Sequence, residues 1–285
     1  MKFAFIEQHR DEFTVQQMCE LLAVSRSGFY AWLEREPSRR EQENGCLTEQ
    51  IRVFHQRSRQ TYGSPRIQAD LQAMGQRVSR KRVARLMREA GIQARRKQGY
   101  KVTTKRNDAA HTVAPNLLNQ DFRAEAANET WVADITYIDT HEGWLYLAAI
   151  LDVYSRKIVG WSMRTRLQKQ LVEDALKMAV GRRDMPQGLR HHSDQGSQYT
   201  SHDFLKLLTQ HGIQVSMSGA GNCYDNAMME SFFATLKTEC VIARFDTRQQ
   251  ARQIIFEYIE VWYNRLRRHS ALGYLSPEQY EQRVA

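Results

Sequence analysis

The chain has 285 residues, four cysteines and a formal net charge of +9, enough length for one sizeable core with one or two small domains. Its longest apolar run, WLYLAAIL at residues 144–151, falls well short of the about 20 residues that a membrane-spanning helix needs. The N-terminal MKFAFIEQ is too short for a signal peptide. The cysteines form no CxxC pair and no GxxxxGK(S/T) loop occurs, which disfavours a zinc site, a disulfide framework and nucleotide hydrolysis and favours reduced thiols in the cytoplasm.

The positive charge is concentrated in one stretch. Residues 51–106 carry 16 Lys and Arg against two acids, whereas residues 1–50 and 107–285 are each slightly acidic. A localised basic stretch is typical of a segment that binds a polyanion, most often nucleic acid.

Residues 14–35 have the pattern of two short helices joined by a turn at Ala23-Val24, with Ser25 able to cap the second helix. This helix-turn-helix pattern predicts a first domain over residues 1–45, with a linker around Pro37, Ser38 and Gly45. Whether it reads DNA is left open, because the segment is acidic. The expected core positions are Val15, Met18, Leu21 and Leu22 in the first helix and Phe29, Tyr30 and Leu33 in the second.

Residues 46–106 repeat the helical pattern with a basic surface, and we predict a second, DNA-binding domain there. Pro65 should begin a helix that Gly75 ends, and Ser79 should cap the next one. Ile67, Leu71, Met74, Val83, Leu86 and Met87 are the expected core positions. The outward face of the last helix is predicted to contact phosphates and guanine edges through Arg80, Lys81, Arg82, Arg85 and Arg88.

Strands alternate with helices after residue 126. We expect a linker over 107–125, a catalytic domain over 126–243 and a helical extension over 244–285. Three strands with tight connections should form an antiparallel meander, followed by helix, strand, helix, strand and helix. The order βββαβαβα is that of the RNase H-like fold, a mixed five-stranded sheet with helices.

The stretch GAGNCYDNAMMESFFATLKTE, residues 219–239, reads as a loop followed by a helix. Asp225 or Asn226 could cap that helix, and Met229, Phe232, Phe233 and Leu236 would face the core. Glu230 and Lys237 lie seven residues apart, two helical turns, and so share another face.

Three acids fall where such a fold would bring them together. Asp134 lies inside the first strand, Asp194 just after the fourth, and Glu230 in the first turns of the last helix. Converging carboxylates repel each other unless a cation neutralises them, and oxygen ligands favour Mg²⁺ or Mn²⁺, with two ions expected. Asp152, Glu239, His191 and His192 are weaker candidates, and Gln195, Gly196 and Gln198 are expected to shape the loop beside the metals.

The segments WVADITYI, LDVYSRKIVGW, HSDQGSQYTS, GNCYDNAMMESFFATLKTE and YNRLRRHSALGYLSPEQY resemble the DDE transposases of bacterial OrfA/OrfB insertion sequences, specifically the OrfB part, whose core is shared with retroviral integrases. The resemblance implies that Asp134, Asp194 and Glu230 are the catalytic, metal-binding triad and that Lys237 approaches DNA. It also implies metal-dependent 3′-end nicking and strand transfer on terminal inverted repeats and target DNA in the bacterial cytoplasm. A homo-oligomer on DNA is expected.

The chain opens with Met1 and no leucine-zipper stretch precedes it, so an OrfA partner or fusion is expected. One alternative is a DNA-binding regulatory subunit with an inactive core. Another is a tyrosine recombinase built on Arg265, His269 and Tyr274, although its covalent chemistry needs no metal. In the C-terminal segment we expect core or assembly positions at Phe256, Ile259, Trp262 and Tyr263, and DNA contacts from Arg265, Arg267, Arg268 and His269.

Overall fold

The computed structural model describes residues 1–95, 114–184, 187–219 and 226–284. The chain divides into two compact units, Met1–Val53 and Phe54–Ala285, and each is described by itself. Within the described residues no helix is both long and apolar enough to cross a membrane.

The first unit is a small helical bundle of α1 (Lys2–Gln8), α2 (Val15–Leu21) and α3 (Arg26–Leu33), followed by the first part of α4 (Arg39–Arg57). The predicted turn and cap are confirmed, because Ala23 has a φ of 51° and Ser25 Oγ accepts a hydrogen bond from Gly28 N. The expected core is partly wrong. Leu21, Tyr30 and Leu33 are exposed, because α1, which the pattern did not predict, packs on the bundle and buries Ile6 with Met18, Cys19 and Phe29.

The predicted linker around Gly45 is also wrong, since α4 passes through that residue. Ser38 and Glu41 begin the helix as a capping box: Ser38 N donates to Glu41 Oε2 at 2.7 Å and Glu41 N to Ser38 Oγ at 3.3 Å. A single glycine costs a helix only about 1 kcal/mol, so the long helix tolerates it.

The second unit begins with the end of α4, then α5 (Ser64–Ala73) and α6 (Arg80–Glu89). The predicted boundaries are confirmed: Pro65 lies in the first turn of α5, Gly75 follows the helix with a φ of +82°, and Ser79 Oγ accepts from Arg82 N. Met74 is the exception among the expected core positions. It is the C-cap residue of α5 and 61% exposed.

The rest of the unit is a mixed sheet covered by helices. Its strands are β1 (Thr130–Ile138), β2 (Leu145–Asp152), β3 (Ile158–Arg164), β4 (Arg190–Ser193) and β5 (Gln214–Met217). They lie in the order β3-β2-β1-β4-β5, with β1, β2 and β3 antiparallel and β4 and β5 parallel to β1. The predicted RNase H-like order and sheet are confirmed.

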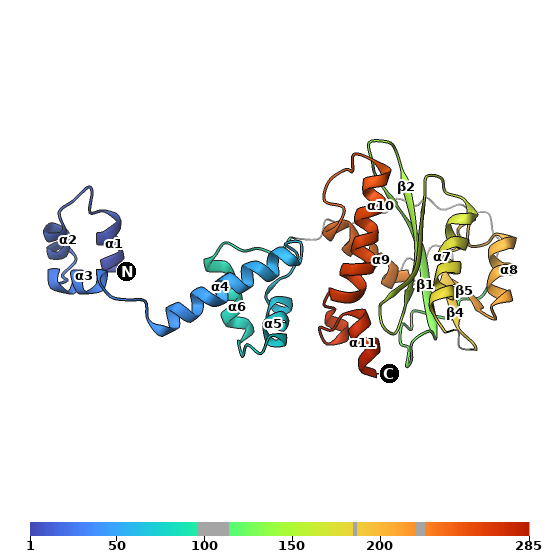
Figure 1. Cartoon of the computed structure of the whole chain (residues 1–285), viewed down its shortest axis with the longest axis horizontal. Coiled ribbons are helices and arrows are strands. Elements are labelled where there is room, and N and C mark those ends of the chain that lie inside the picture. The colour runs from blue at the N-terminus through green and yellow to red at the C-terminus, as the bar shows by residue number, and fades with distance from the viewer. Residues whose placement is uncertain (96–113, 185–186, 220–225, 285) are drawn as a thin grey trace. The chain divides into compact units, whose positions relative to one another are not determined.

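Helices cover both faces of the sheet (Figure 1). On one face, α7 (Lys169–Arg182) and α8 (His202–Gln210) share a core with alternate residues of β1, including Trp131 and Ala133. On the other, α9 (Ala227–Glu239) and α10 (Arg248–Glu257) pack around Val132 and Ile138. The chain ends with a π-helix (Tyr258–Leu266), a 3₁₀ turn (Ser270–Leu272) and α11 (Pro277–Val284).

Part of the predicted linker belongs to this core. Residues 107–113 of the expected linker lie outside the described residues. Beyond them, Leu117 N donates to Ser216 Oγ at 2.9 Å, Pro115 O accepts from Met217 N, and Leu118 is buried. Residues 115–118 therefore pack with the sheet and cover the end of the β5 edge strand.

Candidate active site

The first two acids come from neighbouring strands at the centre of the sheet. In the parallel pair of β1 and β4, Val132 lies opposite His192. Asp134 stands two residues further along β1, and Asp194 follows directly after the end of β4, so the same register brings the two carboxylates to one level at the end of β4. The sequence alone predicted the two residues, and the parallel pairing explains why a separation of 60 positions becomes a spatial pair.

The third acid is carried by α9, which packs on the face of β1 that contains Asp134. Side chains alternate along a strand, so Asp134 points to the same face as Val132, and Val132 shares a core with Met229 and Phe232 of α9. The predicted apolar stripe of that helix, Met229, Phe232, Phe233 and Leu236, is confirmed as buried. Glu230 lies in the first turn beside this stripe and is partly exposed.

An unpredicted contact ties the start of α9 to β1 next to Asp134. Asn226 is the N-cap residue, but its side chain makes no capping hydrogen bond. Instead Asn226 Nδ2 donates to Ala133 O at 3.1 Å. The other expected capping residue, Asp225, lies outside the described residues.

The electrostatics of the three acids reflect their proximity. Burial, the charge of Asp194 and, more weakly, that of Glu230 raise the pKa of Asp134 from 3.8 to about 8, although Ile135 N donates to its carboxylate at 2.7 Å. Burial also raises the pKa of Asp194. A cluster in which one carboxylate retains its proton near neutrality is short of positive charge.

The donor set fits a hard divalent cation. Tyr199, which sequence reasoning missed, has a buried hydroxyl without a hydrogen-bond partner in the described structure, and the charges of Asp134 and Asp194 contribute to raising its pKa. Among the described residues, no three His, Cys, Asp or Glu side chains are arranged to hold an ion by themselves. Mg²⁺ commonly binds through one or two carboxylates and completes its shell with water and substrate phosphate, so Asp134 and Asp194 are residues that could hold such an ion.

Lys237 lies on the same side of α9 as Glu230, as predicted from their spacing. Its ammonium lies 5.2 Å from the centre of the Tyr137 ring, and Asp134 is the charged group that acts on it. Burial lowers the pKa of Lys237. The ammonium of Lys237 is thus close enough to Asp134 to interact with its charge, and it lies over Tyr137 of β1 in a cation–π contact.

The loop after Asp194 holds the carboxylate in place. Gly196 N donates to Asp194 Oδ1 at 3.0 Å, and Gln195 Nε2 donates to Ser218 O. His191 and His192 are buried below it. Burial lowers the pKa of His191 to about 3, and His192 Nδ1 lies 2.8 Å from Ser216 Oγ. These histidines finish the strand within the core.

Two other acids are structural. Asp152 is fully buried and accepts hydrogen bonds from Asn128 N and Ser155 N. Glu239, also buried, accepts from both Nε and Nη2 of Arg267, from Tyr258 Oη and from Trp262 Nε1. The carboxylate oxygens of Glu239 are thus used by four donor groups away from Asp134.

The predicted DNA-binding side chains fall into two groups. On α6, Arg80, Lys81 and Arg88 are exposed and Arg82 and Arg85 are partly exposed, with Arg85 ion-paired to Glu89 at 3.7 Å. In the C-terminal segment the structure disfavours DNA contacts at three residues, because Arg267 and His269 are buried and the partly buried Arg268 is ion-paired with Asp70. Arg268 Nε lies 2.5 Å from Asp70 Oδ1, 198 positions away in sequence. Phe256 of the expected core is 51% exposed.

Comparison with known proteins agrees with this architecture. Residues 124–223 and 211–277 match family models described as integrase core domain, and residues 41–100 match an HTH-like domain. The Insertion element IS600 uncharacterized 31 kDa protein of Shigella sonnei is 49% identical over 273 residues, which is 94% of this chain and 100% of the relative. Transposase InsF for insertion sequence IS3A of Escherichia coli (strain K12) is 44% identical over 286 residues, 99% of this chain and 98% of the relative.

The solved catalytic core domain of HTLV-2 integrase in complex with magnesium is more distant. It is 16% identical, with a TM-score of 0.43, and the match covers 56% of this chain and 99% of that one.

The sheet and the sequence matches define a protein with an integrase core domain joined to an HTH-like domain. More particularly, the chain belongs to the family of insertion-sequence transposases of the IS3 type.

Proposed function

We propose that the chain is a divalent-metal-dependent polynucleotidyl transferase that nicks the ends of its insertion sequence and joins the resulting 3′-hydroxyl to target DNA. The observation that carries this proposal is the pair of carboxylates, Asp134 and Asp194, at one level of adjacent parallel strands, with Glu230 on the helix that covers them. Membership of the transposase family supports the same reaction.

In this proposal Asp134, Asp194 and Glu230 hold Mg²⁺ or Mn²⁺, as one or two ions. When bound, such ions supply Lewis-acid stabilisation of the charge that develops on the phosphodiester. The protein contributes rigidity: the sheet fixes Asp134, Gly196 N orients Asp194, and the Asn226–Ala133 hydrogen bond anchors the helix of Glu230. Lys237, which interacts with the charge of Asp134 and lies over Tyr137, would attract a DNA phosphate.

The basic helix α6 is proposed to bind the terminal inverted repeats through Arg80, Lys81, Arg82, Arg85 and Arg88. The family model described as an HTH-like domain spans this helix, which supports the assignment. We further propose that the chain acts in the bacterial cytoplasm, as a homo-oligomer on DNA, and with an OrfA partner or fusion.

A strand-transfer assay with DNA from the ends of the encoding element tests the proposal, with Mg²⁺ or EDTA and with the OrfA product present or absent. Asp134→Asn and Glu230→Gln should each lower product by more than about a hundredfold, because loss of outer-shell partners alone costs metal sites 10- to 100-fold. Asp139→Asn is the matched control, since Asp139 is exposed just beyond the end of β1 and pairs with Arg244.

Strand transfer that persists in Glu230→Gln would overturn the assignment of the third acid. End binding that survives EDTA, without product under any condition, would instead identify a DNA-binding regulatory subunit with an inactive core.

A further inference from the structure

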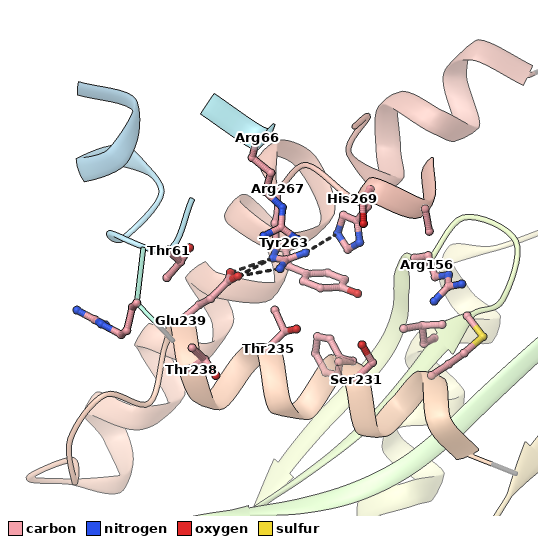
Figure 2. Close-up of a pocket in the computed structure, with 16 residues that line it drawn as sticks. Thr61, Arg66, Arg156, Ser231, Thr235, Thr238, Glu239, Tyr263, Arg267 and His269 are labelled. Carbon is pink, nitrogen blue, oxygen red and sulfur yellow. Dashed lines mark hydrogen bonds and ion pairs between the residues drawn. The ribbon is translucent and has the colours of Figure 1, made fainter. Parts of the chain in front are cut away.

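A polar cavity lies against α9, about a quarter turn around the helix from Glu230 and Lys237. It has a volume of about 320 Å³. Ser231, Thr235 and Thr238 of α9 face it (Figure 2), and Thr61, Arg66 and Arg95 of the preceding helical segment close it. The cavity is therefore built jointly by the segment matched as HTH-like and by the integrase core.

The lining carries more positive than negative charge. Four arginines, Arg66, Arg95, Arg156 and Arg267, face the cavity against one carboxylate, that of Glu239. Glu239 is already used, because its oxygens accept from Nε and Nη2 of Arg267 at 2.8–3.0 Å (Figure 2). The other three guanidinium groups make no ion pair with a carboxylate of the described residues, and Arg66 lies over the Tyr62 ring.

Most N–H donors of the Arg66, Arg95 and Arg156 side chains make no hydrogen bond with described residues. In the described part of the chain, no carboxylate is ion-paired with Arg66, Arg95 or Arg156. Arg66 uses Nε on Arg268 O at 3.0 Å, and Arg95 uses Nη2 on Gln60 Oε1 at 3.4 Å. Arg95 Nη1 is buried with no hydrogen-bond partner in the described structure.

The arginines also affect the pKa of a buried histidine, His269, at the edge of the cavity. Burial first, then the charges of Arg267, Arg66 and Arg156, lower the pKa of His269 to about 2. The imidazole is therefore neutral and adds no charge of its own. Its Nε2 lies 3.4 Å from Arg267 Nη1.

Gathering uncompensated cations in a cavity costs free energy unless an anion neutralises them and accepts their hydrogen bonds. Guanidinium groups match phosphate oxygens in geometry, and nearby hydroxyls can donate to the remaining oxygens. Thr61 and Thr235 are mostly buried in the wall, and Ser231 and Ser270 are exposed at its edge.

We propose that this cavity is a phosphate-binding pocket, in which Arg66, Arg95 and Arg156 receive a phosphate group. We infer that this phosphate belongs to the backbone of bound DNA. This inference rests on the proposed function. One phosphate held by the helical segment and the core together would set the distance along the DNA between the segment that binds it and the carboxylates that act on it.

The first experiment tests the pocket without DNA or catalysis. Inorganic pyrophosphate, added with EDTA at constant ionic strength, should raise the thermal unfolding midpoint of the full chain. The rise should disappear in Arg95→Gln/Arg156→Gln and persist in Arg123→Gln, which removes one charge at a side chain that is 90% exposed. The single variant Arg156→Gln repeats the test in case the double variant does not fold. It should fold normally, because the Arg156 side chain makes no hydrogen bond or ion pair with described residues.

The second experiment identifies the source of the phosphate. DNA from the element's ends is titrated at several salt concentrations, and the slope of log affinity against log salt should be shallower in the double variant by about 0.9 for each DNA phosphate that the protein no longer neutralises. Arg123→Gln should keep the wild-type slope.

Pyrophosphate stabilisation with an unchanged slope would support the pocket and assign it to a free phosphate compound. The proposal would be overturned if poly-glutamate raised the unfolding midpoint and pyrophosphate did not. It would also be overturned if the double variant and Arg123→Gln behaved alike in both experiments. If the wild-type protein showed no strand transfer, the proposed function would be contradicted, but the pyrophosphate result would still support the pocket.

Discussion

Asp134 is the residue at which the conflict between burial and charge is greatest. It is a partly buried carboxylate on the central strand, and Asp194, also partly buried, follows the end of the adjacent strand. Neutralisation can come from a proton or from a metal ion, and the two compete for the same oxygens. The balance between them should depend on pH.

The first prediction concerns metal-free stability. Because the fold raises the pKa of Asp134 from 3.8 to about 8, the protonated form stabilises the folded state. This contribution is complete below the ordinary pKa and disappears as pH rises toward 8. In EDTA, the thermal unfolding midpoint should fall over that window, less steeply in Asp134→Asn.

Mg²⁺ should reverse that fall. We expect the rise in midpoint on adding Mg²⁺ to be larger at pH 8 than at pH 5 in the wild type and in Asp139→Asn, and small at both values in Asp134→Asn. An equal effect of Mg²⁺ at the two pH values would contradict a site that requires ionised Asp134.

Among the elements, the contact between β3 and α7 depends on a glycine. Gly160 lies in β3, and a Cβ at this position would overlap Ala175 O and lie 2.8 Å from Ala179 Cβ. Both belong to α7, and the backbone oxygen cannot turn aside as the end of a flexible side chain could. The helix therefore approaches the strand as closely as it does because Gly160 has no side chain.

We predict that Gly160→Ala lowers the free energy of unfolding by about 1–3 kcal/mol or more, the usual cost of overpacking. Gly181→Ala is the matched control, because Gly181 lies in α7 with no atom within 4 Å of the added Cβ. That change should be neutral or stabilise by up to about 1 kcal/mol. Urea unfolding of both proteins measures the difference, and similar midpoints would show that α7 shifts to make room.

Elements also show where local chemistry suffices. Ser25, Ser79 and Pro65 begin helices as predicted, since a cap or an N-terminal proline acts within one turn of chain. Which face of a helix is buried depends on the elements that pack against it and on where the helix ends. Leu21 is exposed because α1 packs elsewhere, and Met74 is exposed because α5 ends there.

At the level of the whole molecule, DNA binding and chemistry are assigned to different parts of the chain. In the proposed function, the cationic side chains exposed on α6 bind DNA, and the acids of the sheet and α9 hold the metal. Changes in one part should leave the other function measurable.

We expect Arg80→Gln/Lys81→Gln/Arg88→Gln to weaken binding to the element's ends and to reduce the salt slope by about 0.9 for each DNA phosphate that these side chains neutralise in the wild type. Its unfolding midpoint should stay close to the wild type, because all three side chains are exposed. Asp134→Asn should bind the ends with the wild-type slope and form no joined product. Gel-shift and strand-transfer assays on the same preparations separate the two effects, and wild-type binding by the α6 variant would place the DNA-binding surface elsewhere.

By itself, the sequence determined the order of strands and helices, the RNase H-like topology and the capping residues Ser25 and Ser79, and it singled out three candidate acids. Periodicity, caps and turn residues act over a few positions, and the topology then follows from short connections. What only the tertiary structure decided is how charged side chains are used. Arg267 and Arg268 have the spacing of a DNA-binding segment, yet one is paired with Glu239 and the other with Asp70. Arg156 lies in the turn between β2 and β3, with a φ of 62°, and faces a cavity with two arginines from the preceding helical segment. The free energy of a charge depends on its solvation and its partners, and both are set by chain segments far away in sequence.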